Sequence, residues 1–284
     1  MADLDIRDEN NVLIKTEYAK DNYLIREYDN DSPYAIVYFA SHGLYFPNTE
    51  ECFRERIITQ NRYEWMRYRR ANVRKEIYVR DLWKAHYTLG INERISSLEL
   101  LAEFIREQVG GLKLITVGNS AGGYAAVLIG TLLHADYILD FSGQNSIQGY
   151  LQPGERSLEQ KIARTLNPAY CKISELWKSG EVPDLFFFYA SHCEIDQEAW
   201  GDIAGISTFT HVYPIAFDEA VHGKTMYNFN LPAVLNMDKE QLRQIATEFQ
   251  GKTISRFTFS KRIMGVPRSI MHLLSATAHK LLHH

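Results

Sequence analysis

The stretch Leu114-Ile-Thr-Val-Gly118-Asn-Ser120-Ala-Gly122-Gly-Tyr124 decides the fold of this chain. It begins as an apolar, β-branched run typical of a buried strand and continues as a small-residue segment typical of a helix. Gly118 and Gly122 stand two residues before and after Ser120, where side chains would collide with neighbouring backbone in a sharp strand-to-helix turn. Such a turn lifts the serine hydroxyl above the sheet edge and points helix N–H groups towards it. The pattern therefore predicts that Ser120 is a nucleophile.

The same glycine-rich turn has a second interpretation, in which it only packs tightly or binds a phosphate group. The segment lacks the lysine of a phosphate-binding P-loop, however, and it does not have the Gly-x-Gly-x-x-Gly spacing of dinucleotide-binding turns. The residues therefore favour the nucleophile.

Around this stretch, apolar runs that indicate strands alternate with segments whose apolar residues recur every three or four positions, which indicates helices. That alternation predicts an α/β fold, with a mostly parallel central sheet and helices on both faces. Two stretches of alternating polarity, Val12 to Tyr18 and Tyr23 to Tyr28, predict an antiparallel hairpin before the parallel strands. We expect the other strands at Tyr34 to Ala40, Lys75 to Asp81, Leu112 to Gly118, Asp136 to Ser142, Asp184 to Ser191 and Ser207 to Ala216.

The segment from Gly118 to Gly122, in this strand–turn–helix context, resembles the nucleophile elbow of the α/β-hydrolase superfamily. The order of the predicted elements extends the resemblance over roughly residues 12 to 250. The resemblance implies a domain of residues 1–250, in which 145–182 is a helical insertion before the acid-bearing strand that could form a lid. It also implies that the nucleophile is followed along the chain first by an acid and then by a histidine.

A serine hydroxyl needs a base, and the resemblance places that base in a loop just after the last strand. His222, followed by Gly223, occupies such a loop after the strand that we expect at Ser207 to Ala216. His134 and His211 lie near a helix end and inside a strand, which favours packing or surface roles. His222 is therefore the predicted base.

The acid that orients the histidine is expected after the preceding strand. Both Glu194 and Asp196 follow that strand, and Asp196 is favoured because Glu194 comes so soon after it that a local capping role fits better. Asp140, at the end of the strand after the nucleophile helix, is the third candidate.

Stabilisation of the oxyanion requires two backbone N–H groups. The first is predicted at Ala121, directly after the nucleophile. The segment Ser41-His42-Gly43-Leu44 resembles the His-Gly element of the superfamily, and the N–H of Leu44 is the predicted second donor. His42 either holds this loop by a hydrogen bond or is an ordinary turn residue.

Three further features of the sequence have a structural interpretation beside any functional one. Asp81, at a strand end, either lines the cleft or caps the next segment, and Gln144 could face the same crevice. The run from Arg67 to Arg70 reads as a solvated helix face.

Composition excludes several classes of protein. The chain has 284 residues, 45% of them hydrophobic and 23% charged, which is typical of a globular protein. Its net charge of −4 gives no general nucleic-acid footprint. Cys52, Cys171 and Cys193 have no Cys-x-x-Cys spacing, no group of residues has metal-ligand spacing, and the first residues do not resemble a signal peptide. We expect a cytoplasmic protein without a metal or cofactor.

The last segment, residues 251–284, is predicted to be a basic amphipathic tail. It holds six Lys and Arg and no Asp or Glu, whereas the first 250 residues hold 25 Lys and Arg against 35 Asp and Glu. Ile270, Leu273, Leu274, Ala278, Leu281 and Leu282 would lie largely on one side of a helix. That side could contact an anionic membrane or a protein, or it could pack onto the domain.

Together, these residues predict a serine hydrolase that cleaves a carboxylic ester or a thioester, of a small molecule or of a glycan, through an acyl-enzyme. Acyl transfer to an alcohol at the same site is the first alternative, because the two reactions differ only in the exclusion of water and the binding of an acceptor. A non-catalytic binding protein that keeps the fold is the second.

Overall fold

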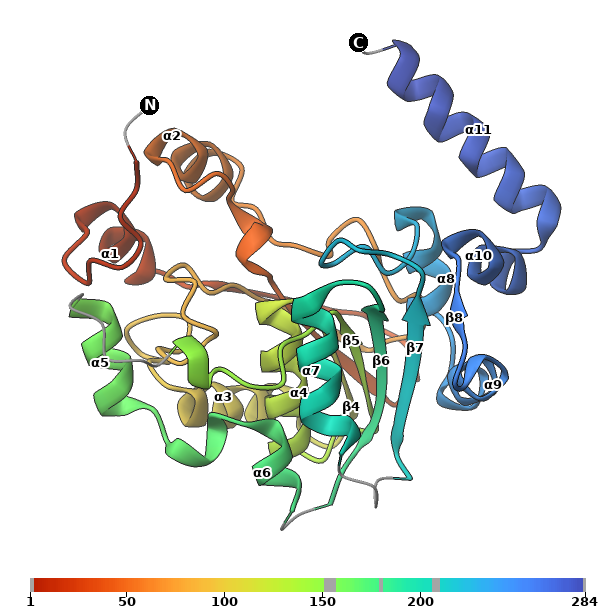
Figure 1. Cartoon of the computed structure of the whole chain (residues 1–284). Coiled ribbons are helices and arrows are strands. Elements are labelled where there is room, and N and C mark those ends of the chain that lie inside the picture. Colours follow the sequence, from red (N-terminus) through yellow and green to blue (C-terminus); the bar gives the residue numbers. More distant parts are fainter. Residues whose placement is uncertain (1–2, 151–156, 179–180, 206–209, 283–284) are drawn as a thin grey trace.

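The computed structural model describes residues 3–150, 157–178, 181–205 and 210–282, and its described part contains one eight-stranded sheet (Figure 1). The strand order is β1-β3-β2-β4-β5-β6-β7-β8. Only the edge strand β1 runs antiparallel to its neighbour, and the other pairs are parallel. The strands are β1 (Tyr23–Glu27), β2 (Tyr34–Phe39), β3 (Lys75–Val79), β4 (Lys113–Asn119), β5 (Tyr137–Phe141), β6 (Asp184–Ala190), β7 (Val212–Phe217) and β8 (Thr253–Ile254). The predicted α/β class is confirmed.

Helices cover both faces of the sheet because side chains along each buried strand point alternately to either side. In β2, Val37 and Phe39 join the hydrophobic core on one face, and Ile36 and Tyr38 join the core on the other. The first core includes α3 (Leu98–Val109), α4 (Ala121–Leu132), α6 (Ile173–Trp177) and α7 (Glu194–Ala204). The second includes α8 (Leu231–Leu235), α9 (Lys239–Phe249) and α10 (Arg256–Met264).

The predicted hairpin at the N-terminus is wrong, because Val12–Tyr18 forms the helix α1. The side chain of Asn11 accepts a hydrogen bond from the N–H of Ile14 and caps the helix. Ile14 and Glu17, three residues apart, are the residues that this helix buries. A helical face and a short alternating strand both fit so brief a pattern, and the cap decides between them.

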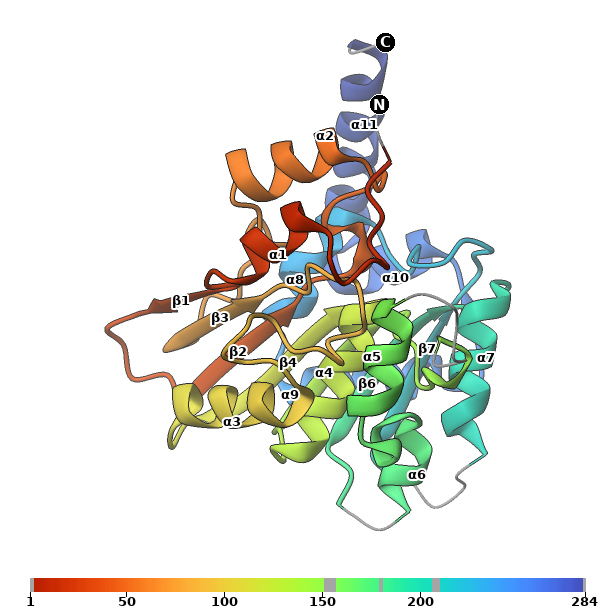
Figure 2. The same ribbon diagram turned by 90° about the vertical axis from the view of Figure 1, so that its left-hand side faces the viewer.

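The insertion 145–182 is helical, as expected, and includes α5 (Ser157–Thr165) and α6. Residues 151–156 and 179–180 of this insertion lie outside the described residues. Leu158 and Ile162 of α5 pack in a third hydrophobic cluster together with Leu4 and Ile14. The α5 part of the insertion therefore lies near α1, as Figures 1 and 2 also show.

The segment after Phe53 forms the rim of the cleft described below. The short helix α2 (Glu50–Phe53) continues into a π-helical turn at Arg54–Thr59, and residues 60–74 then run irregularly to β3. The run Arg67 to Arg70 is not a solvated helix face, because Arg70 is buried and donates hydrogen bonds to the carbonyls of Leu235 and Met237, each at 2.8 Å.

The C-terminal segment starts within the fold. Ile254 of β8 pairs with Phe217 of β7, and Phe259 of α10 is buried in the second core. The helix α11 (Val266–Leu282) follows and extends away from the body (Figures 1 and 2). Within the described residues, no helix is both long and apolar enough to cross a membrane. The predicted division of the chain at residue 250 therefore does not coincide with a break in the packing.

Candidate active site

Ser120 lies at a strained turn between β4 and α4. Its backbone has φ 53° and ψ −122°, a conformation that residues with a side chain rarely adopt. A Cβ atom on Gly118 would stand 1.9 Å from the carbonyl oxygen of Gly122, and one on Gly122 would stand 2.5 Å from the carbonyl oxygen of Phe39. The collisions expected at the two flanking glycines are therefore real, and both positions require glycine.

A chain of hydrogen bonds links Ser120 to a histidine and a carboxylate. His222 Nε2 lies 2.8 Å from Ser120 Oγ, and His222 Nδ1 lies 2.5 Å from Asp196 Oδ1. The second carboxylate oxygen of Asp196 accepts hydrogen bonds from Ser142 Oγ at 2.5 Å and from the N–H of Ala190 at 2.8 Å. Because a carboxylate only accepts, Nδ1 carries the proton and Nε2 is left to accept the proton of the serine.

The other two candidate acids do not bond to His222. Glu194 is the exposed first residue of α7. Asp140 is buried against Gly123 and Gly143, where a Cβ on either glycine would lie 2.2 Å from its carboxylate oxygen. Burial raises the pKa of Asp140 well above its ordinary value, the N–H of Gly143 opposes this shift, and repulsion by Asp196 adds to it. Asp140 is therefore buried away from His222 and does not orient its ring.

The comparisons with known proteins bear on the fold. The capsule O-acetyltransferase of Neisseria meningitidis serogroup A is 11% identical over 80% of this chain and 92% of that chain, with a TM-score of 0.50. An esterase of Pyrobaculum calidifontis is 13% identical over 84% and 87% of the two chains, with a TM-score of 0.43. Esterase B of Lactobacillus Rhamnosis is 10% identical over 83% and 87%, with a TM-score of 0.42. No family model and no curated protein matches the sequence.

The chain has an α/β-hydrolase fold. The mostly parallel sheet, the serine on a strained turn after a central strand, and the chain order Ser, Asp, His are the features that define this fold in the structure.

In the loop after β2, the backbone amide that we predicted as an oxyanion donor is already hydrogen-bonded within the loop. The N–H of Leu44 donates to the carbonyl of Ser41 at 3.1 Å, and the N–H of Gly43 donates to Ser41 Oγ at 3.0 Å. The predicted donor Leu44 is therefore engaged in a tight 3-10 turn. His42 begins that turn and Ala121 begins α4, so both amides lack an intrahelical acceptor and remain available.

Glu64 holds this loop in place, and the sequence provides no signal for it. One carboxylate oxygen accepts from the N–H of Ser41 at 2.6 Å, and the other accepts from Ser41 Oγ at 3.0 Å. Burial raises the pKa of Glu64, whereas the two hydrogen bonds from Ser41 lower it. A single side chain, distant in sequence, thus ties the loop to the rim segment.

Two histidines pack together behind the loop. The rings of His42 and His86 lie 4.7 Å apart, and His86 Nε2 is 2.7 Å from Gln144 Oε1. Burial lowers the pKa of His42 well below its ordinary value and lowers the pKa of His86 to about 4. Both rings are therefore neutral near pH 7. His42 Nε2 is buried without a partner in the described part of the chain, so this atom does not hold the loop.

Asp81 caps a backbone turn. Its carboxylate accepts from the N–H groups of Trp83, Ala85 and Tyr87 at 2.6 to 3.1 Å. Burial raises its pKa to about 6, while these three hydrogen bonds oppose the shift. Of the two roles that the sequence allows for Asp81, the structure therefore shows the capping role.

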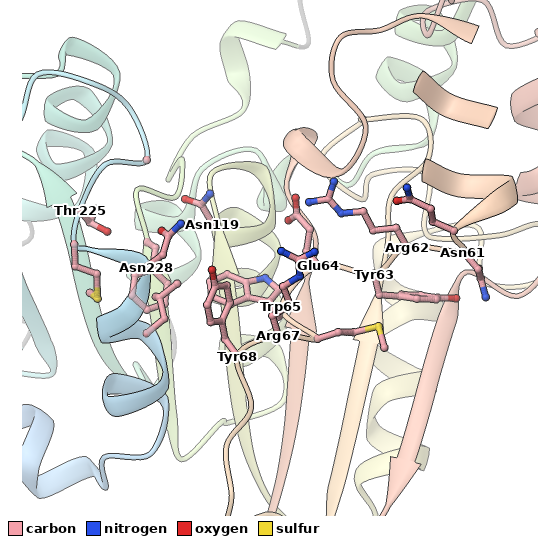
Figure 3. Close-up of a pocket in the computed structure, with 16 residues that line it drawn as sticks. Asn61, Arg62, Tyr63, Glu64, Trp65, Arg67, Tyr68, Asn119, Thr225 and Asn228 are labelled. Carbon is pink, nitrogen blue, oxygen red and sulfur yellow. The ribbon is translucent and has the colours of Figure 1, made fainter. Parts of the chain in front are cut away.

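A cavity of about 710 Å³, which we call the rim cavity, lies between the rim segment and the chain around Asn119 and Gly223 (Figure 3). Asn119 and Gly223, the chain neighbours of Ser120 and His222, line it. Its opposite wall is the rim segment, which we define as residues 60–68. Figure 3 shows Arg62, Glu64 and Arg67 on the rim side and Thr225 and Asn228 facing them. Its size is typical of a small-molecule site.

The second cavity, of about 590 Å³, adjoins the loop after β2. His42, Gly43 and His86 line one part of it, and Leu158 and Ile162 of the insertion line another. Among the described residues, the insertion contributes to this second cavity and not to the rim cavity. A lid role of the insertion stays a prediction.

One group of side chains in the described residues could offer ligands to a metal ion. Ligand atoms of Cys193, Asp196 and His222 all lie within 4.8 Å of one another. Both nitrogens of His222 are already engaged by Asp196 and Ser120, so a metal ion there would have to break one of these hydrogen bonds. The arrangement fits proton transfer better than metal binding.

Proposed function

We propose that this protein is a serine hydrolase that cleaves a carboxylic ester or a thioester through an acyl-enzyme. The observation that carries the proposal is the hydrogen-bonded chain from Ser120 through His222 to Asp196, built on a strained turn beside a cavity. A nucleophile, a base and a group that orients the base are the three elements of this chemistry.

Acylation starts when Ser120 Oγ attacks the acyl carbonyl carbon. The Oγ–C bond forms while the hydroxyl proton passes to His222 Nε2, 2.8 Å away. The bond to the leaving oxygen or sulfur then breaks, and that atom takes the proton from His222. The acyl group remains on Ser120 as an ester.

Deacylation repeats these steps with water. The water oxygen attacks the acyl carbon as its proton passes to His222 Nε2, and the Oγ–C bond breaks as Oγ takes that proton back. The free acid leaves, and Ser120 and His222 return to their starting state.

Three groups lower the barrier of both steps. The buried carboxylate of Asp196 stabilises the imidazolium that forms at His222 and holds its ring in the required tautomer. The N–H of Ala121 and, in place of the predicted Leu44, the N–H of His42 are the proposed donors to the oxyanion, because neither is used within its helical turn.

Acyl transfer is the second candidate, because a second cavity adjoins the same loop. His42 and Gly43 line that cavity, so an acceptor alcohol or an acyl group could lie there while the other reactant fills the rim cavity. Transfer would replace water by the acceptor and leave every other step unchanged.

A fluorophosphonate probe tests the proposal directly. Wild type should gain the mass of one phosphonyl group, located on Ser120 by peptide mass spectrometry, and Ser120→Ala should gain none. Ser96→Ala, which removes an exposed serine that lines neither cavity, is the matched control and should be labelled like wild type. Labelling of another serine, or of none, would instead favour a non-catalytic binding protein.

A further inference from the structure

The wall of the rim cavity combines aromatic rings with amide side chains. Trp65 is fixed by a hydrogen bond from its indole N–H to the carbonyl of Phe39 at 3.0 Å, and its ring lies 5.6 Å from that of Phe141. Tyr68 lies beside them on the same wall. The amides that line the cavity are Gln60, Asn61, Asn119 and Asn228.

This lining suits a sugar better than an acyl chain. Aromatic faces cover the C–H groups of a sugar ring, and amides both donate to and accept from its hydroxyl groups. A long acyl chain would leave these amides desolvated without partners, which is costly.

The rim cavity also carries positive charge that the described residues do not neutralise. Neither Arg62 nor Arg67 has an ion pair in the described part of the chain, although both line the cavity. Glu64 is the acidic residue of the lining, and its two oxygens are occupied by Ser41. Arg62 lies near enough to lower the pKa of Glu64, but no ion pair links them. Two arginines without an ion pair in the described residues therefore line one cavity, in a chain with a net charge of −4.

We infer that the rim cavity binds an acidic glycan that carries the ester. The sugar rings pack on Trp65 and Tyr68, and the arginines Arg62 and Arg67 bind the anionic oxygens, since a guanidinium group matches a carboxylate or a phosphate with paired hydrogen bonds. The ester then lies towards Asn119 and Gly223, next to Ser120 and His222. This inference rests on the proposed function for its ester, but the binding of the sugar does not require turnover.

Binding to the Ser120→Ala variant tests the inference without catalysis. Trigalacturonate should bind at least tenfold more tightly than neutral galactotriose in calorimetric titrations at 20 mM salt, and the difference should shrink at 500 mM salt. Glucose 1-phosphate against glucose forms the phosphate arm, and a preference in only one arm identifies the anionic group. Equal affinity for acidic and neutral sugars in both arms, or no binding, overturns the inference.

Charge variants assign the binding to the two arginines. In the Ser120→Ala background, Arg62→Gln with Arg67→Gln should lower affinity for the acidic sugar about tenfold and leave galactotriose little changed. Arg74→Gln removes an exposed arginine outside the cavity and should change neither. An equal loss with Arg74→Gln would show a non-specific charge effect and overturn the inference. Labelling of Ser120 in wild type by the fluorophosphonate probe distinguishes failure of this inference from failure of the proposed function. Labelling without binding of the acidic sugar overturns only the glycan inference, and binding without labelling overturns only the hydrolase.

A second, independent inference concerns α11. The start of this helix is attached to the body, because Ser269 bonds to Ser260 at 2.8 Å and the ring of His272 stacks on Phe229 at 5.0 Å. Three apolar side chains of the same helix are exposed: Ile270 by 45%, Met271 by 59% and Leu274 by 67%. The expected packing of this side onto the domain is therefore not observed for these residues.

The charge around this apolar face indicates what covers it. No acidic residue occurs from Gly251 to the C-terminus, and Lys261 and Arg268 are exposed near the start of α11. The structure assigns this face to an anionic lipid surface, which takes apolar side chains between its headgroups and attracts Lys and Arg.

Vesicle sedimentation tests this assignment on the full chain. Wild type should sediment with vesicles of 70% phosphatidylcholine and 30% phosphatidylglycerol at low salt and be released at high salt. Ile270→Glu with Leu274→Glu should stay in the supernatant, whereas Leu100→Glu, at a comparably exposed position on α3, should behave as wild type. Wild type that stays in the supernatant, or a dimer that the double variant dissociates, overturns the assignment.

Discussion

On one side of the rim cavity, the segments that follow β4, β6 and β7 carry Ser120, Asp196 and His222, which are hydrogen-bonded to one another. Asp196 alone accepts three hydrogen bonds, from His222, Ser142 and Ala190. On the opposite side, the rim segment 60–68 leaves Arg62 and Arg67 without an ion pair in the described structure and fixes the neighbouring loop through one residue, Glu64.

The difference between the two sides indicates that one side suits proton transfer and the other suits ligand binding. Groups that are bonded among themselves cannot move far, which is what proton transfer between fixed atoms requires. Groups without partners in the protein are available to a ligand. We therefore expect substitutions on the first side to lower kcat and those among the rim arginines to change binding.

The largest effect is expected for Ser120→Ala, which removes the nucleophile. Turnover of p-nitrophenyl acetate should fall by about 10⁶-fold, the scale found when a member of such a triad is removed. The melting temperature should change by less than about 3 °C, because the side chain is small and half-buried. Ser120→Gly should be equally inactive but melt higher than Ser120→Ala, since glycine adopts a φ of 53° without strain. Wild-type turnover by either variant would remove the distinction between the two sides.

The next effect is expected for Asp196→Asn, which places an amide where His222 Nδ1–H needs an acceptor. The kcat should fall by about 10⁴-fold, because the imidazole then adopts the wrong tautomer. Glu194→Gln, two residues earlier and exposed, should stay within about twofold of wild type, as surface substitutions do. A large loss with Glu194→Gln and none with Asp196→Asn would reverse the assignment of the acid.

A smaller effect is expected for Glu64→Gln on the rim. The amide keeps one acceptor for Ser41 but loses the other, so the loop that carries the His42 N–H should shift. We expect kcat to fall by about 10 to 100-fold with little change in KM, since a displacement of about 1 Å is costly in catalysis. Glu107→Gln, an exposed carboxylate on α3, is the control. An unchanged kcat, or a change in KM alone, would place Glu64 among the binding groups.

The smallest effect is expected for Ser41→Ala, which keeps the backbone bond to Glu64 and loses the hydroxyl. Gly43 N–H then loses its acceptor, and one oxygen of Glu64 loses its donor. Each of these two bonds contributes about 1 kcal/mol, so kcat should fall by no more than about 30-fold. Steady-state kinetics of Glu64→Gln, of Ser41→Ala and of the double variant checks the order of the two effects on kcat. A larger loss for Ser41→Ala than for Glu64→Gln would mean that the hydroxyl itself acts in the reaction.

Local pattern sufficed for some elements and failed for others. Val12 to Tyr18 has too few residues to distinguish a strand from a helix, and the Asn11 cap selects the helix. The neighbouring charged residues in the sequence predict that Arg70 is exposed, but it is buried. Its guanidinium group donates hydrogen bonds to the carbonyls of Leu235 in α8 and of Met237 just after α8. The resemblance of residues 41–44 to the His-Gly element predicts Leu44 as a donor, whereas the 3-10 turn uses that amide internally.

The sequence by itself determined the α/β class, and it predicted the sharp turn at Ser120 and the chain order of a serine, an acid and a histidine. Each of these features is local. The strand and helix periods, the two glycines and the loop positions can each be recognised within a short stretch of sequence. Only the tertiary structure decided that Asp196 and not Asp140 meets His222, and that Glu64 reaches Ser41. Those choices depend on which strand ends lie side by side and on which groups are buried, and neither quantity has a signature in a single stretch of chain.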